Sequence, residues 1–148
     1  MIANHFDPTR LQRYVPTALR LALGVIFISH ALTKAFVYTF PGTEQFFVSH
    51  GFPAWTVYPV FALELAGGIA LIVGLGTRVV SLLLIPVMIG AIKPHLASGM
   101  GFSNPGGGWE FPALLVVLLG AQAVLGSGAL ALDAVVGRSA ARMTAATR

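Results

Sequence analysis

The chain has 148 residues, of which 56% are hydrophobic and 9% are charged, and its mean hydropathy is +0.83. An ordinary soluble domain is about 45 to 50% apolar, so this composition excludes that class and indicates an integral membrane protein. The absence of cysteine excludes disulfides, iron–sulfur clusters, thiol redox chemistry and cysteine-based zinc sites. Any redox role therefore requires a borrowed electron carrier.

Four apolar segments each approach the roughly 20 residues that a helix needs to cross a hydrocarbon core of about 30 Å. In chain order they are Pro16–Tyr38, Ala54–Leu75, Val79–Leu96 and Phe111–Leu132. The last one is strongly apolar only as far as Leu125, because Gly126, Ser127 and Gly128 follow it. The predicted fold is an all-α bundle of four transmembrane helices, with the whole chain, residues 1–148, as a single domain.

Arginines are confined to one predicted side of the membrane. The seven of them lie before or near the start of the first span, between the second and third spans, or after the fourth: Arg10, Arg13, Arg20, Arg78, Arg138, Arg142 and Arg148. The loops Thr39–Pro53 and Ala97–Gly108 contain no Lys or Arg, so the positive-inside rule places both termini in the cytoplasm. The net charge of +4 then indicates contact with anionic lipid rather than nucleic acid. We expect a multi-pass protein of the bacterial plasma (inner) membrane.

The N-terminus has a second interpretation. Its basic residues, the apolar run Leu19–Ile28 and the small residues Ser29 and Ala31 loosely imitate a cleavable signal peptide. Cleavage would start the mature chain at Leu32 and remove the first helix.

Between the second and third spans, residues 74–78 predict a tight turn, so these two helices are expected to be antiparallel neighbours. In the second span a stripe of small residues permits close helix approach, with either another span or another subunit as the partner: Ala62, Ala66, Ala70 and Gly74. In the third, Pro86 and Pro94 predict bends, which either adjoin a cavity or serve packing alone.

Six ionisable side chains lie within or at one end of the apolar spans: His30, Lys34, Glu64, Lys93, His95 and Glu110. A charge in lipid costs several kcal/mol unless it is paired or hydrated, so such residues are candidates for function. The predicted orientation places all six in the outer half of the bundle. We expect Glu64 to pair with Lys34 or with Lys93, because a carboxylate at this depth is either paired or protonated.

Each candidate also has a purely structural interpretation. Glu64 can join two helices without binding a ligand, Glu110 suits a helix N-terminus, and Lys34 and Lys93 can extend toward the headgroups. His30 lies one helical turn from Lys34 on the same face, which favours hydrogen bonding or proton exchange. We predict a site for ligand binding and proton exchange formed by His30, Lys34 and Glu64, with Lys93, His95 and Glu110 at its rim.

No covalently bound cofactor is expected, whereas a quinone is suspected as a bound molecule. A haem bound by two histidines is disfavoured by the nearby lysines and by the unequal depth of His30 and His95. A metal site at His30, His95 and Glu64 is also disfavoured, because the Glu-x-x-His motifs of four-helix diiron proteins are absent. The sequence has no P-loop, nucleophile elbow or HExxH motif.

The chain resembles the DoxX family of small four-span membrane proteins in six places between Arg20 and Asp133. These are Arg20 with Gly24, FISHALTK at 27–34, ELAGGIALIVGLGTR at 64–78, His95 with Gly99 and Phe102, GGWE at 107–110, and the closing stretch 126–133. The chain departs from the family in having Ala31 after His30, where Gly is frequent, and Ser127 where Pro is frequent. The resemblance implies a membrane subunit close to quinone chemistry, because the family is named after a subunit associated with a terminal quinol oxidase and with thiosulfate:quinone oxidoreductase. It supplies no agreed catalytic residues.

Three functions are compatible with these observations. The leading one is a quinone-linked redox subunit or partner of a membrane oxidoreductase, with a quinone-like molecule in an apolar cleft and a membrane or peripheral redox protein as electron donor. The second is a non-catalytic assembly or scaffold protein for a partner complex. The third is passage of a small solute or proton through a homo-oligomer. Whether the chain is itself an enzyme stays open.

Overall fold

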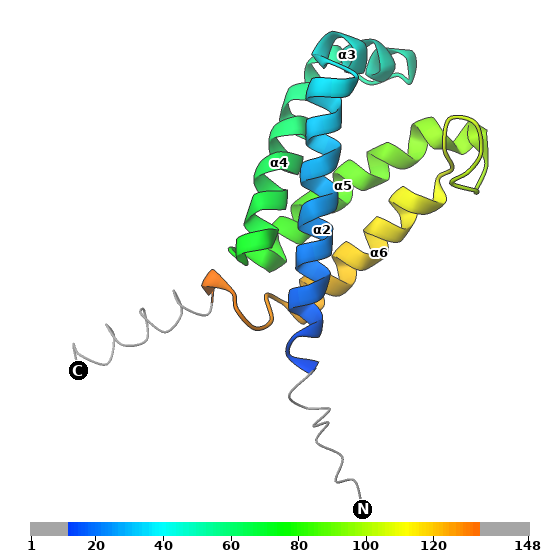
Figure 1. Ribbon diagram of the computed structural model, residues 1–148. Helices are drawn as coiled ribbons and strands as arrows, with labels where there is room; N and C mark the ends of the chain where they lie inside the picture. The colour runs from blue at the N-terminus through cyan, green and yellow to red at the C-terminus, as the bar shows by residue number, and fades with distance from the viewer. Residues whose placement is uncertain (1–11, 134–148) are drawn as a thin grey trace, which may run out of the picture.

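The computed structural model describes residues 12–133, which are helical and contain no strand (Figure 1). The elements are α2 (Val15–Leu32), a π-helix η1 (Thr33–Val37), α3 (Phe40–Ser49), a 3₁₀ turn η2 (Ala54–Thr56), α4 (Val57–Val73), α5 (Thr77–His95), a 3₁₀ turn η3 (Leu96–Ser98) and α6 (Glu110–Leu125). Three segments are long and apolar enough to cross a membrane: Val15–Val37, Ala54–Val73 and Thr77–Ser98. Within residues 12–133 the prediction of an all-α protein is confirmed, with three helices long and apolar enough to span a membrane and α6 as a shorter fourth apolar helix.

The predicted end of the fourth helix differs from the observed one. Helix α6 ends at Leu125 rather than Leu132, and its 16 residues extend about 24 Å. Gly126 leaves the helical conformation with a φ of 83°, and its carbonyl accepts a hydrogen bond of 2.6 Å from the Gln122 side chain. Residues 126–133, here called the closing segment, turn back across the end of the bundle.

A second difference lies in the predicted loop Thr39–Pro53, most of which is the helix α3. Thr39 is its N-cap, with the hydroxyl accepting from Gly42 N at 3.4 Å, and Pro41 occupies the first turn. Both are typical helix-start signals. Helix α3 lies across the upper ends of α2 and α4 in Figure 1.

The four apolar helices pack mainly as two pairs, α2 against α4 and α5 against α6 (Figure 1). Helices α2 and α4 approach closely at Gly24 and Gly68, since a Cβ atom on Gly24 would lie 2.7 Å from the Gly68 carbonyl oxygen. Of the predicted stripe of small residues, Ala62 and Ala66 are exposed. The close contact therefore uses the neighbouring Gly68 instead.

At one end of the bundle, Arg20 is 1% exposed and donates hydrogen bonds to backbone carbonyls from two separate segments. Its acceptors are Leu71 (2.8 Å) and Ile72 at the end of α4, and Ser127 (3.0 Å), Ala129 (3.5 Å) and Leu130 (2.7 Å) in the closing segment. A guanidinium has five donors in a fixed fork, which suits several carbonyls at once. Arg20 therefore joins α2, α4 and the closing segment.

Two further side chains hold the closing segment in place. The Asp133 carboxylate accepts from the backbone of Gly76 at 2.8 Å and of Thr77 at 3.4 Å, at the start of α5. The Thr17 hydroxyl donates to the Ala129 carbonyl at 2.6 Å. A carboxylate at a helix N-terminus is favoured by the helix dipole. This end of the bundle, the Arg20 end, is thus tied to all four apolar helices.

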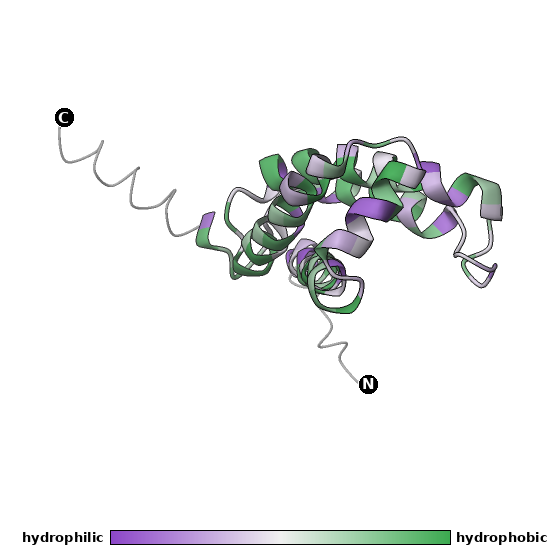
Figure 2. Cartoon of the chain, turned by 90° about the horizontal axis from the view of Figure 1, so that it is seen from above, coloured by the Kyte–Doolittle hydropathy of each residue, from purple (hydrophilic) through white to green (hydrophobic). Residues whose placement is uncertain are grey.

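Between the Arg20 end and the other end, the interior is a layer of buried apolar side chains. Its members are Leu23, Phe27, Leu71, Leu84, Met88, Leu115 and Leu119. Large apolar side chains also cover the outside, including Val25, Leu83 and Val117, each more than half exposed. Figure 2 shows that hydrophobic residues make up much of these helices, as expected for helices that contact lipid.

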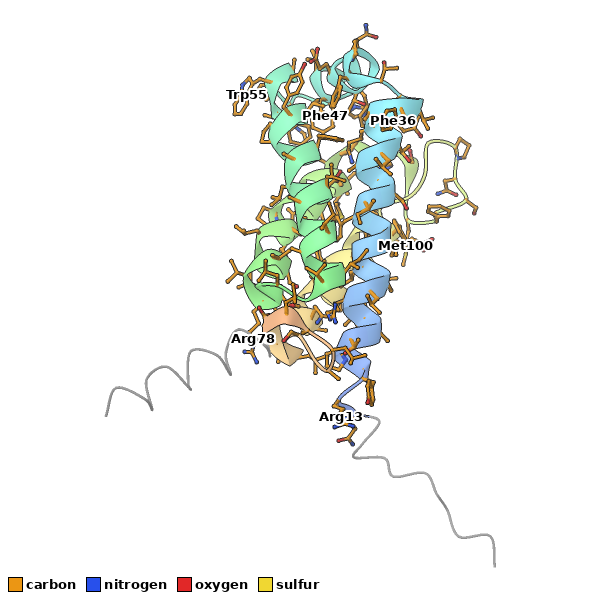
Figure 3. All side chains as sticks on the ribbon, turned by 60° about the vertical axis from the view of Figure 1, so that its left-hand side comes forward. Arg13, Phe36, Phe47, Trp55, Arg78 and Met100 are labelled. Atoms are coloured by element: carbon orange, nitrogen blue, oxygen red, sulfur yellow. The ribbon has the colours of Figure 1, made fainter. Side chains whose placement is uncertain are left out.

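The two ends of the bundle differ in their side chains. Arg13 and Arg78 lie at the Arg20 end, whereas Phe36, Phe47 and Trp55 lie at the opposite end (Figure 3). This separation is compatible with the orientation predicted from the arginines, which itself stays a prediction.

Because the chain has no cysteine, single substitutions can test that orientation. In spheroplasts, a membrane-impermeant maleimide is expected to label Ser49→Cys, at the exposed end of α3, and to label Arg78→Cys only after permeabilisation. The unsubstituted chain is the blank. The opposite labelling pattern would show that the termini face outward.

Replacement of Arg20 tests the role of the Arg20 end. Arg20→Met should lower the free energy of unfolding by at least about 3 kcal/mol, because it leaves several buried carbonyls without a donor. Arg20→Lys should recover only part of the loss, since an ammonium lacks the planar fork. The measurement is unfolding in mixed micelles, with the exposed Arg78→Met as the control. Equal stability of the Arg20 and Arg78 variants would contradict the assignment.

Candidate functional site

A cavity of about 410 Å³ lies between the two helix pairs, on the far side of the apolar layer from Arg20. Every apolar helix and the α3 region contribute to its lining. The polar lining residues are His30, Lys34, Thr56, Glu64 and His95. The remaining lining is apolar or aromatic, as is typical of a pocket for a small organic molecule.

Lys34 and Glu64 form an ion pair at the cavity wall. The Lys34 Nζ lies 2.7 Å from Glu64 Oε2 and 2.9 Å from Oε1, and Glu64 is only 1% exposed. Of the two lysines predicted as partners of Glu64, the structure selects Lys34. The pair joins the end of the first span to α4, so the interpretation as a helix-joining contact also fits the geometry.

Lys34 belongs to the π-helix η1 rather than to a regular α-helix. The wider turn is closed by a hydrogen bond of 3.0 Å from Tyr38 N to the Thr33 carbonyl. The Lys34 carbonyl accepts from the Thr43 hydroxyl of α3 at 3.2 Å. Short π segments within α-helices are rare and frequently occur at functional sites. The residues of this segment show no π-specific pattern, so the sequence does not predict it.

The two histidines contribute differently. His30 lines the cavity and is exposed, and its ring is stacked on Phe111 with 5.9 Å between centroids and 16° between planes. It makes no side-chain hydrogen bond to another residue within 12–133, so both ring nitrogens remain available. His95 Nδ1 bonds to the Gly106 carbonyl at 2.9 Å, which orients this ring at the opposite wall. In a neutral His95, Nδ1 is therefore the donor and Nε2 is left to accept.

The other two predicted rim residues lie outside the cavity lining. The Lys93 ammonium sits 4.8 Å from the centroid of the Phe52 ring, a cation–π contact that holds a cavity-lining aromatic residue. Glu110, the first residue of α6, accepts a hydrogen bond from Phe102 N at 2.5 Å. It thus stabilises both the helix start and the preceding loop, as its structural interpretation predicts.

Several lining residues were not predicted as part of a site. Phe46, Phe47 and Phe52 come from α3 and the turn after it, a segment read as a loop. On α5, cavity-lining residues recur every four positions, at Pro86, Gly90 and Pro94. That spacing marks one helix face and is readable in the sequence, although only the prolines were noted. Both prolines line the cavity, as one of the two interpretations of the predicted bends requires.

Within residues 12–133, no group of three His, Asp or Glu side chains is placed to hold a metal ion. The site therefore offers one ion pair, two imidazoles and aromatic walls. Such groups can stack on a flat ring, donate hydrogen bonds to carbonyl oxygens and exchange protons.

Comparison with known proteins identifies relatives. Residues 15–102 match the family described as DoxX. The chain is 38% identical over 115 residues to a Bacillus subtilis protein named "Putative oxidoreductase CatD". The aligned region covers 78% of this chain and 81% of that relative. No solved structure matches the chain significantly.

A double-mutant cycle tests the ion pair. Lys34→Met and Glu64→Gln should each lower the free energy of unfolding, Lys34→Met by about 3 kcal/mol, because it leaves a buried carboxylate without its counter-charge. The double variant should lose less than the sum of the two, since neither charge remains. Unfolding in mixed micelles measures all four proteins. Strict additivity would show that the two side chains do not interact.

Proposed function

The chain belongs to the DoxX family, and from this premise we propose that it is a quinone-linked subunit of a membrane oxidoreductase, with the quinone ring bound in the cavity. One observation carries the proposal: a membrane-embedded cavity of about 410 Å³ joins aromatic walls to a buried ion pair and a free imidazole. The name of the Bacillus subtilis relative, an oxidoreductase, supports the same direction.

The lining fits the chemistry of a quinone. A quinone is a flat apolar ring with carbonyl acceptors at opposite ends. Phe46, Phe47 and Phe111 offer aromatic faces and edges for the ring. The Lys34 ammonium has three N–H groups and donates hydrogen bonds to both Glu64 oxygens. One N–H group is left to donate to a quinone carbonyl. His30 provides a second donor from the neighbouring turn of the same helix.

In this proposal the polar residues of the cavity transfer protons to and from the quinone. Reduction of a quinone to a quinol takes up two electrons and two protons. His30 is suited to accept and release a proton because its ring lines the cavity and has no competing hydrogen-bond partner among the described residues. With no cysteine in the chain, the electrons must come from a partner redox protein.

Passage of a solute within a single bundle is disfavoured, whereas passage through a homo-oligomer stays a prediction. The cavity ends at Met88 and Leu115, and below them Leu23, Leu84 and Leu119 are all fully buried. A proton or ion would have to cross this apolar layer without hydrogen-bonding groups. The scaffold alternative gains no specific contact from the structure.

Binding of a tailless quinone to the purified chain in nanodiscs tests the proposal. Saturable binding is expected, and His30→Phe should weaken it about tenfold, because the variant keeps an aromatic ring beside Phe111 but removes one hydrogen bond. Glu44→Gln is the matched control, since Glu44 bonds to Tyr58 at 2.6 Å outside the cavity. Absence of saturable binding, or equal binding by the His30 and Glu44 variants, would refute the proposal.

A further inference from the structure

The seam between α4 and α5 is tightly packed at the Arg20 end. A Cβ atom on Gly67 of α4 would lie 3.3 Å from Leu84 Cδ1 and 3.4 Å from Val80 Cγ1 of α5. The turn at residues 74–76 joins the same two helices below this contact. There is no room here for a ligand between them.

One and a half turns further along α5, the same seam is open. Gly90 lines the cavity, and a Cβ atom added to it would meet no atom within 4 Å. Pro86, one turn before it, lines the cavity and is also exposed on the outside of the bundle. Val60 and Thr56 form the facing wall on the α4 side. Pro86 thus belongs both to the cavity wall and to the outer surface of the bundle, and the space beside Gly90 is unfilled.

Two other edges of the cavity carry contacts between rings or charges. Toward the α3 end, the Lys93 ammonium lies 4.8 Å from the centroid of the Phe52 ring. Between α2 and α6, the rings of His30 and Phe111 are stacked, and His30 is exposed there as a polar group. The edge at Pro86 and Gly90 differs from both because its α5 side is apolar.

The edge at Pro86 and Gly90 lies at the depth of the hydrocarbon core of the membrane. Pro86 is the tenth of the 19 residues of α5, a helix that belongs to a membrane-spanning segment. The middle of a spanning helix lies in the hydrocarbon core, where no water is present. Its exposed neighbours Leu82, Leu83 and Ile89 are apolar, as lipid contact requires. Whatever passes this edge must be an apolar chain.

We propose that the α4–α5 seam at Pro86 and Gly90 is a lateral entrance from the bilayer, through which a quinone enters ring first and along which its apolar tail then lies. The inference rests on the proposed function for the ring, and it adds the substrate class: a membrane-resident quinone with an isoprenoid tail. The ring reaches Lys34, Glu64 and His30 while the tail stays in contact with lipid.

Two glycines permit a matched test. Gly90→Leu places a side chain in the entrance, whereas Gly120→Leu places the same side chain in open space on α6, outside the cavity lining. Leu is the better helix former, so both variants should fold. In nanodiscs, Gly90→Leu should weaken binding of a prenyl-tailed quinone about tenfold more than binding of a tailless quinone with the same ring, and Gly120→Leu should weaken neither.

A photoreactive group on the tail tests the path in the unsubstituted protein. A diazirine on the second isoprene unit should label Val60 and residues 86–90, and excess unlabelled tailed quinone should prevent the labelling. Labelling confined to α3 or to the α2–α6 side would overturn the proposal, as would equal losses of tailed and tailless quinone in Gly90→Leu. Labelling of the seam by a diazirine phospholipid that the tailed quinone does not displace would show a lipid groove only, and would also overturn it. Failure of the ring site itself is recognised separately, because the tailless quinone then does not bind the unsubstituted chain.

Discussion

The hydrogen bonds of Arg20 to backbone carbonyls determine where the bundle is closed and where it can be open. One guanidinium holds the last turn of α4 and the closing segment against α2, and Asp133 carries the connection on to the start of α5. An arginine inside a spanning segment is costly unless each of its N–H groups donates a hydrogen bond. The free carbonyls at the end of α4 accept such bonds from Arg20. Because the two helix pairs are tied at this end, they can separate at the other and leave a cavity.

The second buried charge in the bundle is neutralised in a different way. Glu64 lies deep in α4 and depends on a single side chain, Lys34, that reaches it from a π-helical turn. Arg20 binds backbone carbonyls, which are free at the end of any helix. The Lys34–Glu64 pair is instead a specific pair of charges at the wall of the cavity. A purely structural contact would gain nothing from a neighbouring cavity, and a fully packed apolar pair would serve stability as well. The position of the pair, more than its existence, favours a role in ligand binding.

The sequence was sufficient for the features that depend on composition and local pattern: the apolar helices, the tight turn after α4, and a pair between Glu64 and one of two lysines. It was insufficient where the outcome depends on long-range contacts. The predicted fourth helix continues to Leu132, yet the carbonyls of Ser127 and Leu130 accept hydrogen bonds from Arg20, which is more than 100 residues away. The choice of Lys34 over Lys93 follows from the π-helical turn and from the contact of Lys93 with Phe52. Helix α3 could have been predicted, because Thr39 and Pro41 are helix-start signals in the sequence. This segment has no long apolar run, however, and that absence favours a loop.

The arrangement of layers along the bundle has a chemical consequence. From the Arg20 end, α6 presents Gln122, then Leu119 and Leu115, and finally Phe111 at the cavity, and α5 shows the same order from Thr77 through Leu84 to Met88. Polar groups thus lie on both sides of a buried apolar layer. On one side Arg20 is bound to backbone carbonyls, whereas His30, Lys34 and Glu64 lie on the cavity side. Water can reach them only from that side, whereas an apolar chain can reach them through the seam between α4 and α5. A ligand whose ring exchanges protons and whose tail avoids water is the kind of molecule that meets both conditions.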